Sequence, residues 1–193
     1  MRIKHKIILQ LKKMIHILGF TNIQTSNEFI KKIAIENYLE KKINELKINN
    51  PSDLCCFEYQ VFSQNGEDGI IREIFDRVGL TNKYFVEFGV GDGTENNTGY
   101  LLLNGWKGSW IEGDSQNNNK IKSALKNMLK SNNLSLLEAF VTVDSILDCF
   151  KQLEVPIEFD LLSIDIDGND FWIWQALKQY KPRVVVIEYN GSL

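Results

Sequence analysis

Cysteine and histidine are scarce in this sequence, and their scarcity excludes several kinds of site. Among 193 residues there are 3 cysteines and 2 histidines. Two cysteines, Cys55 and Cys56, are adjacent and the third is Cys149, so the chain has neither a disulfide framework nor the paired C-x-x-C spacing of a zinc site. A reducing cytoplasm is the simplest location. Because His5 and His16 both lie near the N-terminus, outside every motif, proton abstraction in the folded domain falls to a carboxylate, a lysine, a tyrosine or a metal-bound group.

The sequence also lacks a long apolar run and a surplus of basic residues. Lysines interrupt every apolar run near the N-terminus, so this segment has neither the core of a signal peptide nor the ~20 apolar residues that span a bilayer. The formal net charge is −3, whereas a domain that binds a polyanion usually carries a basic surplus. A secreted protein, an integral membrane protein and a nucleic-acid-binding protein are therefore not expected.

Length and composition favour one folded domain with an N-terminal extension. A chain of 193 residues with 44% hydrophobic content can bury one core and leaves no room for a second folded domain. The breaker Asn49–Asp53 separates an extension, residues 1–50, from the domain, residues 51–193. Within the extension, Arg2–Phe20 has the pattern of a basic amphipathic helix, and Lys31–Leu46 that of a second charged helix. The first helix either docks on its own domain or on a second subunit, makes weak peripheral contact with an anionic membrane, or is disordered.

Apolar runs alternate with helical patterns through the domain, which predicts an α/β fold with a parallel sheet and right-handed crossovers. The predicted strands are Tyr84–Phe88, Ser109–Glu112, Ala139–Val143, Phe159–Asp165 and Arg183–Glu188. The predicted helices are Glu67–Val78, Asn97–Asn104, Gln116–Lys130, Ser145–Gln152 and Asp170–Tyr180.

The first predicted strand runs directly into a loop of alternating glycines, Gly89, Gly91 and Gly93. Glycine tolerates positive φ and has no Cβ, so such a loop can wrap closely around a small molecule. The spacing is G-x-G-x-G, and Thr94 stands where a dinucleotide fingerprint has its third glycine. The loop therefore predicts a nucleotide-like ligand other than a dinucleotide.

Two acids near this loop favour S-adenosylmethionine as the ligand. Glu87 closes the first strand and is suited to the positively charged methionine end, whereas Glu112 closes the next strand and can accept both ribose hydroxyls. Because carboxyl ends of parallel strands meet at one edge of a sheet, five acids should converge there, namely Glu87, Glu112, Asp144, Asp165 and Glu188. Clustered carboxylates repel, so they need a cation, a proton or hydrogen-bond donors.

The turn Asp165–Asp170 is a second candidate for chemistry. Its three acids alternate like the ligands of a hard cation, although the distal glutamate of a calcium hand is absent. One hypothesis is a Mg²⁺ site formed by Asp165, Asp167, Glu188 and Asn190. The competing hypothesis is that Asp165 contacts the methionine end or the acceptor, Asp167 acts as base or substrate ligand, and Asp170 caps the following helix. The aromatic residues of that helix are expected mainly in the core and the pocket wall.

Five separated motifs resemble the FkbM-like family of S-adenosylmethionine-dependent methyltransferases, and the resemblance runs from about residue 57 to residue 191. The motifs are Phe62–Asp68, Phe85–Gly89, Asn97–Thr98, Gly105–Glu112 and Leu162–Asp170. Gly113–Asp114 departs from the family, because many relatives carry a proline-containing turn there. A second departure is the end of the chain just after the fifth predicted strand.

The resemblance implies a Rossmann-like class I methyltransferase sheet and O-methylation, frequently of a sugar hydroxyl in polysaccharide biosynthesis. It also implies that the Ser63–Asp68 loop closes over the cofactor, where the pattern alone is equally typical of an N-cap and turn. The predicted cofactor-binding residues are Gln64, Glu67, Glu87, Gly89, Gly91, Asp92, Gly93, Glu112, Asp144 and Asp165. The predicted catalytic residues are Asp165, Asp167 and Glu188, with direct in-line methyl transfer and a carboxylate that removes or relays the hydroxyl proton.

The fifth predicted strand raises a packing question. Val184–Ile187 is a continuous apolar run, which is typical of a buried strand, yet the sequence lacks the two strands that usually cover it. We expect either a fragment or a partner, including a second copy, that covers this edge. Two other functions stay open: a cofactor-binding module without catalytic activity, which binds without turnover, and a nucleotide-sugar or dinucleotide enzyme, against which the G-x-G-x-G spacing argues.

Overall fold

The computed structural model describes residues 41, 44–45, 48–49, 51–166 and 168–188. Contacts divide the chain into two units, Met1–Cys56 and Phe57–Leu193, and the sheet belongs to the second. The helix predicted for Arg2–Phe20, and most of that predicted for Lys31–Leu46, lie outside the described residues. Within the described ranges, every helix is too short or too polar to traverse a bilayer.

The second unit is built on five parallel strands in the order β3-β2-β1-β4-β5. This order confirms the predicted Rossmann-like α/β fold, and it places the topological switch point, where the order of the strands reverses, between β1 and β4. The strands are β1 (Tyr84–Phe88), β2 (Lys107–Glu112), β3 (Leu134–Glu138), β4 (Glu158–Ile164) and β5 (Lys181–Ile187). In such a sheet, ligands bind at the carboxyl ends of the strands, next to the topological switch point.

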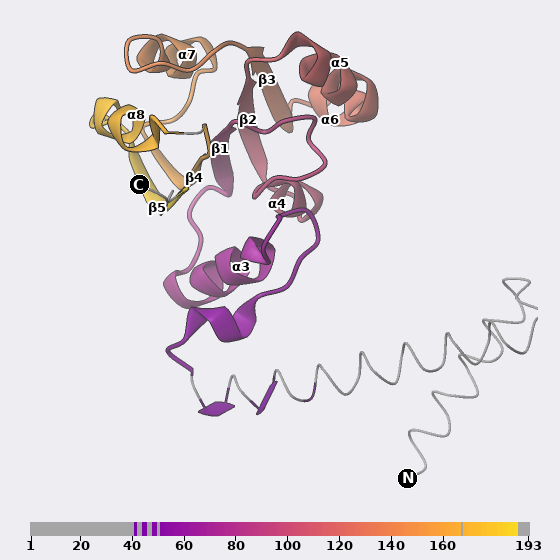
Figure 1. The fold of residues 1–193 in the computed structure, drawn as a ribbon, viewed down its shortest axis with the longest axis vertical. Helices are drawn as coiled ribbons and strands as arrows, with labels where there is room; N and C mark the ends of the chain where they lie inside the picture. Colours follow the sequence, from indigo (N-terminus) through magenta and orange to yellow (C-terminus); the bar gives the residue numbers. More distant parts are fainter. Residues whose placement is uncertain (1–40, 42–43, 46–47, 50, 167, 189–193) are drawn as a thin grey trace, which may run out of the picture. The chain divides into compact units, whose positions relative to one another are not determined.

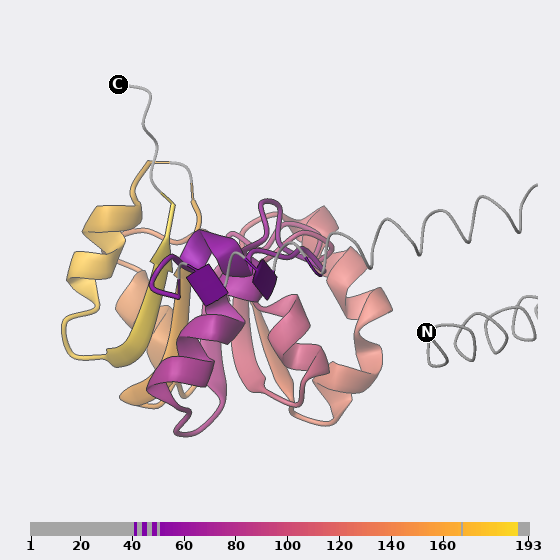
Figure 2. The same cartoon turned by 90° about the horizontal axis from the view of Figure 1, so that it is seen from below.

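Helices cover both faces of the sheet, α7 and α8 on one side and α3 and α4 on the other (Figures 1 and 2). Alternate side chains of one strand enter opposite cores: Phe85 packs with the α3 side, and Val86 and Phe88 with the α7 side. The helices are α3 (Glu67–Val78), α4 (Gly99–Leu103), α5 (Ser115–Ala124), α6 (Lys126–Lys130), α7 (Ile146–Gln152) and α8 (Asp170–Ala176), preceded by a 3₁₀ turn at Leu54–Phe57.

The third strand lies five residues earlier than predicted, at Leu134–Glu138 in place of Ala139–Val143. The β-branched residues of 139–143 gave a misleading signal, because this segment forms the turn that leads into α7. In that turn the Thr142 N–H donates to Ser145 Oγ at 2.9 Å, and the Ser145 N–H donates to Thr142 Oγ1 at 3.1 Å. Asp144 therefore lies in this exposed turn, and the prediction that it closes a strand is wrong.

Two further differences concern element boundaries and burial. The single helix predicted for Gln116–Lys130 is two helices, because Leu125 (φ −106°, ψ 25°) leaves helical geometry between α5 and α6. This break lets Leu125 join Met128 and Leu129 in packing against the core on the α3 side. Strand β5 lies at an edge of the sheet in the described residues, and Val184–Ile187 is half-buried there.

Candidate active site

The glycines of the loop after β1 differ in how much space surrounds their Cα atoms. Gly89, Gly91 and Gly93 all have positive φ, at 79°, 57° and 83°. A Cβ at Gly89 would collide with the carbonyl oxygen of Asp165, and one at Gly93 would lie 3.1 Å from the Trp110 ring. A Cβ at Gly91 would meet nothing within 4 Å. Gly89 and Gly93 therefore serve internal packing, and Gly91 faces open space.

The carboxylate of Glu112 is fixed beside this open loop at the carboxyl end of β2. Its Oε2 accepts the Gly91 N–H at 2.8 Å, and its Oε1 accepts the Asp114 N–H at 2.8 Å. The side chain of Asn118 anchors the same strand end by donating to the Glu112 carbonyl at 2.9 Å. Each carboxylate oxygen keeps a further lone pair, so the group can still accept hydrogen bonds from ligand hydroxyls.

Asp92 and Phe140 flank this region in different ways. Asp92 accepts from the Thr94 hydroxyl and pairs with Lys120 at 3.2 Å, and the Thr94 bond and then Lys120 lower its pKa. Phe140 follows β3, and its side chain is 80% exposed. The Phe140 ring lies where Gly113 has no side chain, since a Cβ on that glycine would be 2.6 Å from it. The glycine at position 113 thus makes room for the exposed Phe140 ring at the carboxyl ends of β2 and β3.

Glu87 is buried within a network of hydrogen bonds that holds the loop before α4. Its Oε1 accepts the Asn97 N–H at 2.8 Å and the Ser163 hydroxyl at 3.2 Å. Its Oε2 accepts the Thr98 N–H at 3.1 Å and the Thr98 hydroxyl, which in turn accepts from Trp110 Nε1 at 2.8 Å. Burial raises the pKa of Glu87, and the bonds from Thr98, Asn97 and Ser163 oppose that rise without cancelling it. Hydrogen-bond donors thus stabilise this acid, as clustered carboxylates require.

The polar loop Ser63–Asp68, at the start of α3, contains residues that bond within the loop and residues that face the cavity. Oδ2 of the buried Asp68 accepts the Ser63 hydroxyl and the N–H groups of residues 61, 62 and 63, at 2.7–2.9 Å. These bonds fix the loop, and the Ser63 hydroxyl in turn accepts the Asp68 N–H in the first turn of α3 at 3.0 Å, whereas the N-cap residue itself is Gly66. Gln64 and Glu67 lie on the cavity side, where Gln64 Nε2 donates to Glu95 at 3.3 Å and Glu67 accepts the Asn65 N–H at 2.8 Å.

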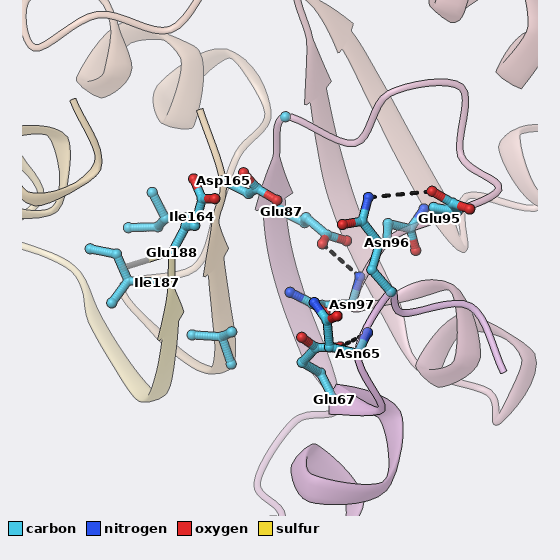
Figure 3. A pocket seen from close by; sticks show the side chains of 13 residues that line it. Asn65, Glu67, Glu87, Glu95, Asn96, Asn97, Ile164, Asp165, Ile187 and Glu188 are labelled. Carbon is cyan, nitrogen blue, oxygen red and sulfur yellow. Dashed lines mark hydrogen bonds between the residues drawn. The ribbon is translucent and has the colours of Figure 1, made fainter. Parts of the chain in front are cut away.

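A cavity of about 410 Å³ lies at the carboxyl ends of β1, β4 and β5, closed on one side by the two loops just described (Figure 3). Apolar side chains from β4 and β5 form one part of its wall, and carboxylates and carboxamides form the rest. Its lining residues are Gln64, Asn65, Glu67, Glu87, Gly89, Glu95, Asn96, Asn97, Ile164, Asp165, Val186, Ile187 and Glu188.

The turn after β4 contributes Asp165, and the end of β5 contributes Glu188, to this cavity. Asp170 is buried and accepts the N–H groups of Ile166 and Gly168, both at 3.0 Å, so it shapes the turn rather than capping α8. Asp167 and Asn190 lie outside the described residues. No group of three or more His, Cys, Asp or Glu side chains arranged to hold a metal occurs in the described part of the chain, and the Mg²⁺ hypothesis stays a prediction.

The predicted site residues separate into two neighbouring groups. Those that line the cavity are Gln64, Glu67, Glu87, Gly89, Asp165 and Glu188. Those that do not are Gly91, Asp92, Gly93 and Glu112, around the loop and β2, and Asp144, in the turn before α7. Sequence reasoning missed Asn65, Glu95, Asn96 and Asn97 as lining residues, although Asn65 and Asn97 belong to motifs that carried the family resemblance.

The aromatic residues at the start of α8 were expected in the core or the pocket wall. In the structure they lie in neither. Phe171, Trp172 and Trp174 are 50%, 59% and 43% exposed. The helix buries Ile173 and Leu177 instead, which lie one turn apart on its inner face.

Comparison with known proteins finds solved structures that align with this chain but no matching sequence family. No family model matches the chain, and no curated protein matches it significantly. The O-methyltransferase from Bacillus cereus in complex with SAH aligns at 16% identity and TM-score 0.49, over 80% of this chain and 71% of that one. A putative O-methyltransferase from Klebsiella pneumoniae aligns at 17% and 0.48, over 77% and 67%. The precorrin-6y C5,15-methyltransferase from Geobacter metallireducens GS-15 aligns at 19% and 0.45, over 67% of this chain and 64% of that one. The fold assignment itself rests on the order and direction of the five strands.

Proposed function

We propose that this protein is an S-adenosylmethionine-dependent O-methyltransferase of the FkbM-like family that acts on a sugar hydroxyl. In this proposal residues 51–193 form the catalytic domain and residues 1–50 an extension. The observation that carries it is the fixed carboxylate of Glu112 beside the open space at Gly91, next to a cavity at the same edge of the sheet.

The residues around Gly91 fit the nucleoside half of S-adenosylmethionine. Glu112 is held by two backbone N–H groups and keeps lone pairs for the two ribose hydroxyls. The exposed ring of Phe140 offers a flat apolar surface for the adenine, because every base has a π-face that stacks on aromatic side chains. The open space at Gly91 leaves room for the ligand to approach the backbone.

The cavity fits the methionine half and the acceptor. When bound, S-adenosylmethionine would supply a methyl group on a positively charged sulfur; the acceptor oxygen would bond to this methyl carbon as the carbon–sulfur bond breaks and S-adenosylhomocysteine leaves. The carboxylates of Glu87 and Asp165 line the part of the cavity nearest the glycine loop and favour positive charge. Glu188, just after β5 and on the side of the cavity opposite Glu95, takes the proton from the acceptor hydroxyl. Alignment of the two reactants and exclusion of water supply most of the rate.

Truncating Phe140 tests where the nucleoside binds. Phe140→Ala should weaken S-adenosylmethionine binding roughly tenfold or more, since stacking of a base on an aromatic ring is worth about 1–3 kcal/mol. Thermal unfolding should barely change, because the ring is mostly exposed. Calorimetric titration of the purified variant measures the effect.

The matched control for this substitution is Phe171→Ala. Phe171 is also exposed, at 50%, but lies on α8 and does not line the cavity. Its removal should leave the affinity unchanged. Equal affinities for Phe140→Ala and the unmodified chain would place the nucleoside elsewhere.

A further inference from the structure

The charged groups around the cavity are all of one sign. Five of its lining residues carry carboxylates: Glu67, Glu87, Glu95, Asp165 and Glu188. Among the described residues that line it, none is a lysine, an arginine or a histidine. Four further lining residues are carboxamides, which donate and accept hydrogen bonds without charge: Gln64, Asn65, Asn96 and Asn97.

The carboxylates differ in how far the protein itself satisfies them. Both oxygens of Glu87 accept internal hydrogen bonds, so this acid is largely committed to the protein. Glu95 is exposed, and its described side-chain contact is the long 3.3 Å bond from Gln64. Glu188 is also exposed, on the opposite side of the cavity (Figure 3). A ligand in the cavity therefore meets negative potential from both sides.

The floor of the cavity has a different character. Ile164 at the end of β4 and Val186 and Ile187 on β5 line it with aliphatic surface. A pyranose presents C–H groups on its face and hydroxyls around its edge. The aliphatic floor suits the face, and the surrounding carboxylates and carboxamides suit the hydroxyl edge, because both accept hydrogen bonds.

We infer that the acceptor is a sugar that carries no phosphate or carboxylate, either neutral or with an amino group. This inference rests on the proposed function and narrows its acceptor class. A sugar phosphate or a nucleotide-linked sugar would bring like charge against Glu95 and Glu188 in a site that, in its described part, offers no cation for phosphate. Like-charge juxtaposition is costly, and phosphate recognition ordinarily uses arginine, lysine or a metal ion.

The test measures methyl transfer from S-adenosylmethionine labelled in its methyl group to matched acceptors. Glucose, galactose and mannose each provide a methyl glycoside, a 2-amino sugar, a 6-phosphate and a nucleotide-linked form. For the 193-residue chain, kcat/KM should be about 100-fold or more higher for the glycosides or amino sugars than for the matched phosphorylated forms.

Reversing the charge of Glu95 tests whether the cavity wall causes the discrimination against phosphorylated acceptors. Glu95→Lys places a cation at the cavity wall. It should therefore lower the ratio of kcat/KM for unphosphorylated over matched phosphorylated acceptors by about tenfold or more. Glu158→Lys is the matched control, since Glu158 is exposed at the amino end of β4, the opposite edge of the sheet, and gives the same change in net charge. This control should leave the preference unchanged.

The outcomes separate the acceptor class from the function itself. A chain that does not bind S-adenosylmethionine in a prior titration refutes the proposed function. A chain that binds it but prefers a phosphorylated acceptor, or transfers to none of the non-anionic sugars, overturns the acceptor class alone. An equal shift in Glu95→Lys and Glu158→Lys would contradict the role of the cavity wall.

Discussion

Replacement of Glu112 by alanine should lower the affinity for S-adenosylmethionine about 100-fold or more while the sheet stays folded. A hydrogen bond to a charged group contributes roughly 1.5–3 kcal/mol, and about 1.4 kcal/mol corresponds to a tenfold change in affinity. Two ribose hydroxyls on one carboxylate therefore account for at least two orders of magnitude. The substitution also removes the acceptor of the Gly91 N–H, so the loop beside the ligand loses its anchor.

The control for this change is Glu138→Ala, at the register partner of Glu112 on the neighbouring strand β3. Glu138 is exposed and contacts Lys122 at 3.4 Å, so its removal should leave the affinity and the stability nearly unchanged. Calorimetric titration measures both variants, and circular dichroism checks that they are folded. Undiminished binding by a folded Glu112→Ala variant would show that this acid does not hold the ribose.

The largest loss of stability is expected from Asp160→Asn. Asp160 lies in β4 with no exposed surface, and its carboxylate accepts the N–H groups of Thr81, Asn82 and Lys83 at 2.7–3.1 Å. It also accepts from the Thr81 hydroxyl at 2.7 Å and from Arg183 at 3.2 Å. These bonds fix the turn that leads into β1, and thus the strand that carries Glu87.

The amide of asparagine places an NH₂ group against backbone donors and leaves the Arg183 charge without its partner. Arg183 is partly exposed and also donates to the carbonyls of Val78 and Gly79, so the expected cost is mainly that of leaving buried backbone donors without an acceptor, about 1–3 kcal/mol. Denaturant titration at neutral pH gives the value. Asp148→Asn, an exposed acid on α7 that pairs with Lys151, is the control and should change little. Equal stability of Asp160→Asn and the unmodified chain would contradict the assigned role.

The same variant should show a distinct dependence on pH. Burial tends to raise the pKa of Asp160, but the bonds from Thr81, Lys83 and Arg183 outweigh it and the net pKa is lowered. A lowered pKa means that the ionised acid stabilises the fold above its unfolded pKa of about 3.9, and that this contribution is lost as the pH falls toward the folded pKa. The difference in stability between the two proteins should therefore shrink below about pH 4.

The sequence predicted well those elements whose local signals agree with their packing. Strand Tyr84–Phe88 and helix Glu67–Val78 have the predicted bounds, because the apolar run of the strand, the single apolar face of the helix and the flanking glycines all agree with the final structure. The third strand was misplaced, because Ala139–Val143 has stronger strand propensity than Leu134–Glu138. Pairing with β2, a tertiary interaction, decides the register.

The sequence placed candidate site residues correctly in the fold where topology alone positions them. Glu112, Asp165 and Glu188 lie at or just beyond strand ends, as the order of a parallel sheet requires. The hydrogen bonds from Thr98 and Ser163 to Glu87 depend on the tertiary structure, and no spacing in the sequence predicts them. The exposure of Trp172 could not be read from composition either, since aromatic residues on a helix usually face the core.

Isothermal titration of the 193-residue chain with S-adenosylmethionine and, separately, with NAD tests the proposed cofactor most directly. We expect saturable binding of S-adenosylmethionine with one site per chain and no measurable binding of NAD, because Thr94 replaces the third glycine of a dinucleotide loop. Binding of NAD in preference to S-adenosylmethionine, or binding of neither by a folded chain, would contradict the proposed cofactor.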